Sequence, residues 1–326
     1  MKKIINDVEN VEQEMIEGLV KSRPQKLEAG NIVVRKERKQ GKVALVSGGG
    51  SGHEPAHGGY VGRGMLDAAV AGPVFTSPTP DMVYEGIKAV ATDAGVLCIV
   101  KNYTGDVMNF EMAVDMAKDD DIKADYVVVN DDVAVEDSSF TTGRRGVAGT
   151  ILVHKIAGAR AEEGGTLEEV KAVAEKVIAN VRTMGMAIKP CTVPAAGKPG
   201  FELPEDEMEI GIGIHGEPGT HREKLQKANE IAKQLLDKIL ADIDYSGKEV
   251  AVIVNGMGAT PLMELYIVNN FVQDYLKEKN VKVYDTMVGN YMTSIEMAGF
   301  SLTLLRLDDE LKRLYDAPAD TAAIHR

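Results

Sequence analysis

Short apolar runs alternate with longer amphipathic stretches along this chain, a pattern typical of layered α/β proteins. The first half predicts strands over residues 43–46, 95–101 and 124–129, and helices over residues 82–92, 109–118, 147–163 and 166–183. The second half predicts strands over residues 207–214, 249–255, 281–287 and 300–306, and helices over residues 220–241, 261–279 and at the C-terminus. Thr166, with Glu169 three residues later, is a capping-box signature for the start of one helix.

Proline and glycine interrupt this pattern between Met184 and Pro204. The segment contains Pro190, Pro194, Pro199, Pro204, Gly185, Gly197 and Gly200. Such clusters mark turns and linkers, and the 326 residues of the chain exceed the usual domain length of about 100 to 200 residues. We therefore predict an N-terminal α/β domain over residues 1–184 and a C-terminal α/β domain over residues 185–326.

The charge balance excludes several classes of partner. The chain carries 37 basic and 50 acidic residues, a net charge of −13, and no basic cluster stands out. Nucleic acids and anionic membranes are therefore disfavoured. Four glutamates within the first 20 residues exclude a signal-peptide core, and no later apolar run has the length of a membrane span, so we expect a cytoplasmic protein. Cys98 and Cys191 show neither metal-ligand spacing nor a disulfide framework, and we expect no metal site.

A glycine-rich stretch, KVALVSGGGSGHEP, places His53 just after an apolar strand pattern. Because the glycines lack side chains, a small polar ligand can approach this backbone closely. The stretch lacks the lysine and hydroxyl residue of a P-loop, and Pro55 interrupts the helix that a dinucleotide fingerprint needs. A ligand-binding loop and a tight structural turn both remain open. We interpret His57, four residues later, as supportive rather than catalytic.

A second glycine-rich stretch, EMEIGIGIHGEPG, places His215 at the end of another strand pattern. Ile210, Ile212 and Ile214 alternate there with small or polar residues before the histidine. Two imidazoles carried on loops indicate polar chemistry.

Two further loops at strand ends carry polar candidates. Asp106, in KNYTGDVMNF, follows the strand that ends near Val100, at the edge where open α/β sheets collect active-site groups. The alternative is that Asp106 caps a helix beginning near Asn109. Ser77, in FTSPTPD, can donate a hydrogen bond to a ligand or simply start a turn before Pro78. Three strand ends therefore converge in the predicted sheet.

Together these stretches resemble the dihydroxyacetone kinase family, and in particular its dihydroxyacetone-binding subunit of the phosphotransferase-system-dependent form. The resemblance spans essentially the whole chain. It is carried by GGGSGHEPAHGGYVG (48 to 62), FTSPTPD (75 to 81), KNYTGDVMNF (101 to 110), GRRGVAGT (143 to 150), GIGIHGEPG (211 to 219) and NGMGATPLMELYI (255 to 267). The resemblance implies two α/β domains, each a mixed β-sheet flanked by helices, with the covalent histidine in the second domain.

The resemblance also implies roles for individual residues. His215 bonds covalently to the carbonyl carbon of dihydroxyacetone as a hemiaminal, and His53 and Asp106 flank the substrate hydroxyl. Substrate contacts are assigned to Gly50, Ser77 and the backbone of Lys101. The adduct distinguishes dihydroxyacetone from glycerol, which has no carbonyl. Asp106 is suited to accept the hydroxyl proton during phosphoryl transfer, with His53 assisting.

Finally, the resemblance implies a divided enzyme. Relatives that use ATP alone carry a second, helical nucleotide-binding domain, which we do not find before Arg326. We therefore expect no cofactor on this chain, ADP or ATP with Mg²⁺ on a partner subunit, and recharging by a phosphoryl carrier of the phosphotransferase system. A homodimer is also expected. The alternative is a dihydroxyacetone-sensing paralogue that acts as co-activator of a transcriptional regulator.

Overall fold

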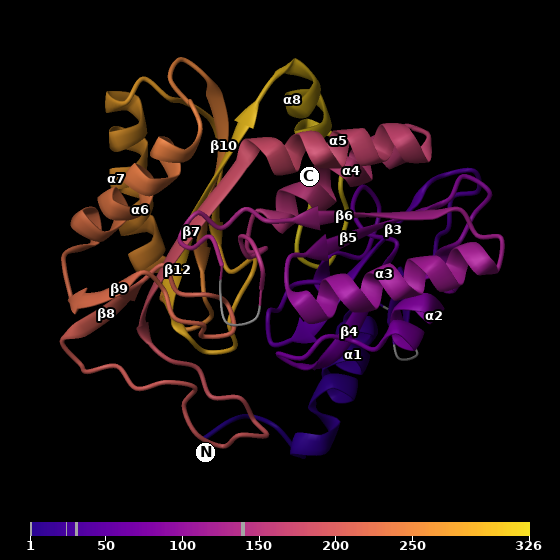
Figure 1. Ribbon diagram of the computed structural model, residues 1–326, viewed down its shortest axis with the longest axis horizontal. Helices are drawn as coiled ribbons and strands as arrows, with labels where there is room; N and C mark the ends of the chain where they lie inside the picture. Colours follow the sequence, from indigo (N-terminus) through magenta and orange to yellow (C-terminus); the bar gives the residue numbers. More distant parts are fainter. Residues whose placement is uncertain (1, 24, 30–31, 138–140) are drawn as a thin grey trace.

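A computed structural model describes residues 2–23, 25–29, 32–137 and 141–326. Two six-stranded sheets lie side by side, one in each half of the molecule (Figure 1). The first has the order β1 (Leu27–Ala29), β2 (Ile32–Arg35), β4 (Ala68–Val74), β3 (Ala44–Ser51), β5 (Val96–Lys101), β6 (Ala124–Val129). The second has the order β11 (Lys282–Gly289), β10 (Glu249–Gly256), β12 (Ala298–Leu307), β7 (Val181–Lys189), β8 (Glu207–Ile210), β9 (His221–Lys224). The predicted fold class, two mixed sheets flanked by helices, is confirmed.

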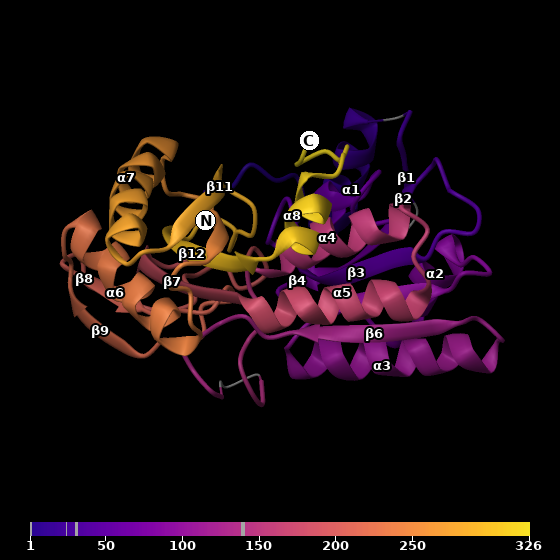
Figure 2. The same ribbon diagram turned by 90° about the horizontal axis from the view of Figure 1, so that it is seen from above.

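The first sheet is buried on both faces. Strands β4, β3, β5 and β6 run parallel, and β2 and β1 extend the sheet antiparallel at one edge. Val46 and Cys98 pack toward α2 (Pro80–Val90) and α3 (Thr104–Asp119), whereas Leu45 and Ile99 face α4 (Thr150–Glu162) and α5 (Leu167–Asn180). Figure 2 shows α3 and α5 on opposite sides of β6. Burial on both faces explains why these strands read as continuous apolar runs.

The second sheet shares its core with the first. On one face, Val252 and Leu304 pack against α6 (Ala228–Asp242) and α7 (Leu262–Glu278). On the other face, Ala251 and Ile253 join α8 (Asp309–Asp316) in the same apolar cluster that underlies α4 and α5. Residues of both sheets therefore pack into one continuous core, which holds loops of the two halves against each other.

Several predicted boundaries are wrong. The strand that precedes His53 continues through the glycine run to Ser51, where a turn had been expected. The helix expected from residue 220 begins at Ala228, because His221–Lys224 instead pairs with β8 as an exposed edge strand. The strand expected to end at residue 214 ends at Ile210, since Gly211 adopts a φ of 77°. The expected linker begins inside β7, so Met184 and Gly185 lie in a strand. The domain boundary at residue 184 remains a prediction.

Other boundaries agree closely. The capping box of Thr166 and Glu169 is present at the start of α5, and the strands predicted near residues 95, 124, 249 and 300 correspond to β5, β6, β10 and β12. A short N-terminal helix, α1 (Val11–Ser22), precedes the first sheet. Within the described ranges, no helix combines the length and the apolar character needed to cross a bilayer.

Candidate functional site

The parallel strands of the first sheet end at one edge, and the residues that follow them surround a cavity of about 790 Å³. The cavity is lined by Gly50, Phe75, Thr76, Ser77, Tyr103, Thr104, Gly105, Asp106, Asn109, Thr141, Thr142 and His215. These residues come from β3, the segment after β4, the start of α3 and the segments before α4 and after β8. The convergence of three strand ends that the sequence predicted is therefore confirmed, and the second half of the chain adds His215.

Four of the predicted site residues, Gly50, Ser77, Asp106 and His215, line this cavity. The other two, His53 and Lys101, are almost completely buried and are not among the lining residues that the structure describes. Each still contacts the lining: His53 lies against His215, and Lys101 lies near Asp106. The six residues thus form one group, with four members lining the cavity and two lying behind them.

His215 is held by Glu217, a residue that the sequence had not singled out. The Nδ1 of His215 lies 2.9 Å from one carboxylate oxygen of Glu217, and the backbone N–H of His215 donates to the other oxygen at 2.9 Å. Burial alone would raise the pKa of Glu217, but His215 and Arg145 lower it to about 2. Glu217 is therefore a carboxylate that only accepts, so the Nδ1 of His215 carries a hydrogen. The Nε2 atom is left as the reactive nitrogen.

His53 faces that reactive nitrogen. Its Nδ1 lies 2.8 Å from the backbone oxygen of Thr293, which only accepts, so this nitrogen is the donor. Its Nε2 lies 3.1 Å from the Nε2 of His215. Burial, followed by the charges of His215 and Lys101, holds the pKa of His53 well below its usual value. His53 is therefore neutral with a lone pair on Nε2, and the contact becomes a hydrogen bond when a proton sits on the Nε2 of His215.

Aromatic rings fix both imidazoles in place. Tyr103 and Phe75 meet the His215 ring edge-on, at centroid distances of 4.6 and 5.1 Å, and Phe75 also stacks on His53 at 5.1 Å. Glu217 and these rings could have been suspected only from their positions in the HGEPG, FTSPTPD and KNYTGD stretches, because no spacing rule connects them.

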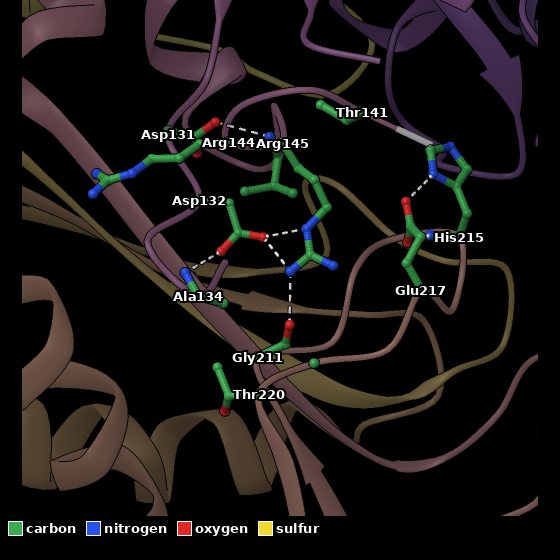
Figure 3. Close-up of polar contacts among 12 residues, drawn as sticks. Asp131, Asp132, Ala134, Thr141, Arg144, Arg145, Gly211, His215, Glu217 and Thr220 are labelled. Carbon is green, nitrogen blue, oxygen red and sulfur yellow. Dashed lines mark hydrogen bonds and ion pairs between the residues drawn. The ribbon is translucent and has the colours of Figure 1, made fainter. Parts of the chain in front are cut away.

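Arg145, from the GRRGVAGT stretch, braces the loop of His215 from the first half of the chain (Figure 3). Its Nε and Nη2 donate to Asp132 at 2.8 and 2.7 Å, and Nη2 also donates to the backbone oxygen of Gly211 at 2.7 Å. Asp132 in turn accepts from the N–H of Ala134. Since Arg145 has no exposed surface, this ion pair is fully desolvated and fixes the start of the segment that leads to His215.

Asp106 is not the helix cap that the alternative interpretation required. It lies in the first turn of α3, whose N-cap residue is Tyr103. One oxygen of Asp106 lies 3.9 Å from Nζ of Lys101, and the other is buried without a hydrogen-bond partner. Because Asp106 also lines the cavity, its carboxylate is suited to accept a hydrogen bond from a ligand hydroxyl.

The glycine run serves internal packing as well as the cavity. A Cβ on Gly50 would lie 2.5 Å from the backbone nitrogen of Thr76, and one on Gly49 would lie 2.7 Å from Nζ of Lys101. Gly50 lines the cavity, as the ligand-binding interpretation predicts. Gly49 and Gly50 also lie close to other parts of the protein, whereas the tight turn of the alternative interpretation is not present, because β3 extends through Ser51. Ligand binding by Gly50 stays a prediction.

Comparison with known proteins places these residues in a family context. A family model described as the Dak1 domain matches residues 17–323. The PTS-dependent dihydroxyacetone kinase 1, dihydroxyacetone-binding subunit DhaK, of Listeria innocua is 61% identical over 99% of this chain and 100% of its own length. The solved dihydroxyacetone kinase operon co-activator Dha-DhaQ superposes with a TM-score of 0.90 at 40% identity, covering 95% and 97% of the two chains. The C. freundii dihydroxyacetone kinase, solved with AMP-PNP and Mg²⁺, gives 0.90 at 34% identity, covering 98% of this chain and 60% of the kinase.

Proposed function

Because the chain belongs to the Dak1 family, we propose that it is the dihydroxyacetone-binding subunit of a phosphotransferase-system-dependent dihydroxyacetone kinase. The kinases among its relatives are phosphotransferases. The observation that carries the proposal is the contact between the Nε2 atoms of His53 and His215 beside a cavity that also exposes Asp106. That arrangement supplies a nucleophile, a proton acceptor for it, and a second base for a hydroxyl.

The first step is covalent capture of the substrate. His53 accepts the proton from Nε2 of His215, and the freed lone pair attacks the carbonyl carbon of dihydroxyacetone. The electrons of the broken C=O π bond move to the oxygen, which takes the proton back from His53 and becomes a hydroxyl. A hemiaminal results, with the positive charge on the His215 ring beside the carboxylate of Glu217. The positive charge therefore passes to His53 while that residue holds the proton and returns to the His215 ring, beside Glu217, as the hemiaminal forms.

Capture through a carbonyl gives specificity. Glycerol matches dihydroxyacetone closely in size and polarity, so hydrogen bonds from Ser77 or Asp106 would separate the two poorly. Glycerol cannot form the C–N bond. Selection by His215 therefore rests on chemical reactivity rather than on shape.

The second step is phosphoryl transfer to a hydroxyl of the captured substrate. The hydroxyl oxygen forms the new bond to the γ-phosphorus of a nucleotide while the bond to the leaving phosphate oxygen breaks, and Asp106 takes the hydroxyl proton. We assign the nucleotide and its Mg²⁺ to a separate partner subunit, because the Listeria innocua relative, matched over 100% of its own length, is named as a dihydroxyacetone-binding subunit. A phosphoryl carrier of the phosphotransferase system would recharge that partner. We further propose that the chain works as a homodimer.

Reconstitution tests this proposal. The purified chain is supplied with dihydroxyacetone, the nucleotide-carrying subunit of its own organism and the phosphoryl carriers with phosphoenolpyruvate, and dihydroxyacetone phosphate is followed. Product is expected only in the complete mixture. Product from the chain with ATP alone would contradict the division of labour between subunits.

A second candidate function is supported by the similarity to the Dha-DhaQ co-activator, which is as close in fold as the kinase. A co-activator would capture dihydroxyacetone on His215 and pass the signal to a transcriptional regulator. Asp106, with its unpaired buried oxygen, has a clear use only in transfer, and this favours the kinase. Capture of substrate with no product from any nucleotide-carrying partner would favour the co-activator.

A further inference from the structure

A line of buried nitrogen atoms leads from Asp106 into the core, and neither proposed step uses it. Nζ of Lys101 lies 3.9 Å from an oxygen of Asp106 and 3.2 Å from Nε2 of His57. Nδ1 of His57 lies 3.0 Å from Nε2 of His154, on α4. All of these side chains are buried. The first half of the chain therefore places two further imidazoles directly behind the proposed base.

The neighbouring hydroxyl of Ser47 fixes the direction of the hydrogen bonds. Its hydrogen is donated to the backbone oxygen of Ile99 at 2.7 Å, so its oxygen can only accept from Nδ1 of His57, 3.4 Å away. A hydrogen on that Nδ1 also reaches the Nε2 of His154. The Nε2 of His57 is then a lone pair, and Lys101 must donate to it.

The location of the positive charge follows from burial. Burial, followed by the charge of Lys101, keeps the pKa of His57 well below its usual value and lowers the pKa of His154 to about 3, so both imidazoles are neutral. Burial also lowers the pKa of Lys101, while Asp106 and Glu217 oppose that effect. The positive charge therefore sits on Lys101, with Asp106 in ion-pair contact. A buried ammonium needs such a counter-ion.

Gly49 lies directly beside this ammonium. Its φ is 150°, and a Cβ there would lie 2.7 Å from Nζ of Lys101 and 3.5 Å from the near oxygen of Asp106. A side chain at this position would push the ammonium away from the carboxylate. The glycine thus leaves room for the ion pair.

We propose that the Lys101 ammonium, held in place by His57 and His154, is the fixed counter-ion that positions the Asp106 carboxylate to accept the substrate proton. His57 and His154 are then positioning residues for phosphoryl transfer, acting through Lys101. The inference rests on the acid–base role proposed above for Asp106. Other ionisable groups that face this cluster are His53, His215, Glu217, Tyr103 and Arg145.

The pH dependence of transfer tests the role of the charge. In Lys101→Met, the acid limb of the pH–rate profile should move up by about 1 to 3 pH units, because the carboxylate loses its cation. A purely structural defect would lower the rate equally at every pH. His57→Leu should shift the profile similarly, whereas His57→Gln, which keeps an acceptor for Lys101, should retain it. His221→Gln, at an exposed position, is the control. Profiles that do not move in Lys101→Met and His57→Leu would overturn the proposal.

A second measurement needs neither partner nor turnover. Nitrogen chemical shifts of the resting wild-type protein should report a hydrogen on Nδ1 and a bare Nε2 for both His57 and His154. A hydrogen on Nε2 of His57 would require Nζ of Lys101 to accept it, which only a neutral lysine can do, and this result would overturn the proposal. The measurement uses the wild-type protein, so it stands even if the variants fail to fold. Loss of transfer in the wild type with every partner would contradict the kinase function instead, and the tautomer result would then decide this inference.

Discussion

The Nε2 atoms of His53 and His215 lie 3.1 Å apart, although 162 positions separate the two residues in the sequence. Each imidazole is anchored through its other nitrogen, His53 to the backbone of Thr293 and His215 to Glu217. Both anchors only accept hydrogen bonds, so a single proton between the two Nε2 atoms completes the network. That proton is the one that capture of a carbonyl must move and return.

The role of Glu217 can be tested by neutralising it. Glu217→Gln keeps the size of the side chain but removes the charge that balances the His215 ring, so capture of dihydroxyacetone should weaken. Hydrogen bonds to charged groups contribute about 1.5 to 3 kcal/mol, which corresponds to roughly 10- to 150-fold in apparent Kd. Calorimetric titration with dihydroxyacetone measures this change. Glu205→Gln, at an exposed position, should bind normally, and normal binding by Glu217→Gln would contradict the assignment.

The roles of Asp106 and His215 can be distinguished by assaying phosphoryl transfer and covalent capture independently. Asp106→Asn should still form the adduct, because capture uses the two histidines, while transfer falls by about 10²- to 10⁴-fold through loss of the base. Single-turnover assays with the nucleotide-carrying subunit give the transfer rate, and the mass of the intact protein reports the adduct. A variant with near-normal transfer would remove Asp106 from the chemistry.

The buried ion pair between Arg145 and Asp132 predicts that removing Arg145 lowers the free energy of unfolding. Arg145→Met leaves Asp132 buried without its partner, and breaking a buried pair costs about 3 to 5 kcal/mol. Urea unfolding of the variant measures this change. Arg144→Met is the matched control, since its ion pair with Asp242 is partly exposed and contributes less. Equal losses at the two positions would show that the buried pair has no special role.

Buried histidines make stability depend on pH. Burial lowers the pKa of His154 to about 3, from a usual value near 6.5. Between these two pH values the unfolded chain binds a proton at His154 and the folded chain does not. The contribution of neutral His154 to the free energy of unfolding is fully present above pH 6.5. It is lost as the pH falls toward 3, at about 1.4 kcal/mol per pH unit. His53 and His57 shift in the same direction. Urea unfolding between pH 7 and 5 should show a steep loss. The dependence of stability on pH should be shallower in His154→Phe, and an unchanged slope in that variant would contradict the account.

The chemistry-bearing strand ends could be predicted from sequence because local signals mark them. Glycine runs and polar residues after apolar strands located His53, Asp106 and His215, and the structure brings all three to one cavity region. Arg145 and His154 act through contacts with residues far away in sequence, and Glu217 acts by setting the tautomer of His215; no periodicity encodes either effect. The β9 strand was missed because its charged residues, at an exposed sheet edge, show none of the alternation that marks a half-buried strand.

The central claim, that His215 captures a carbonyl covalently, is tested most directly by mass spectrometry of the intact protein after gentle exposure to dihydroxyacetone. The account predicts one added dihydroxyacetone per chain, mapped to His215, with none from glycerol and none in His215→Ala. The exposed-site control His221→Ala should be labelled like the wild type. An adduct that persists in His215→Ala, or one that maps to Lys101, would contradict the account.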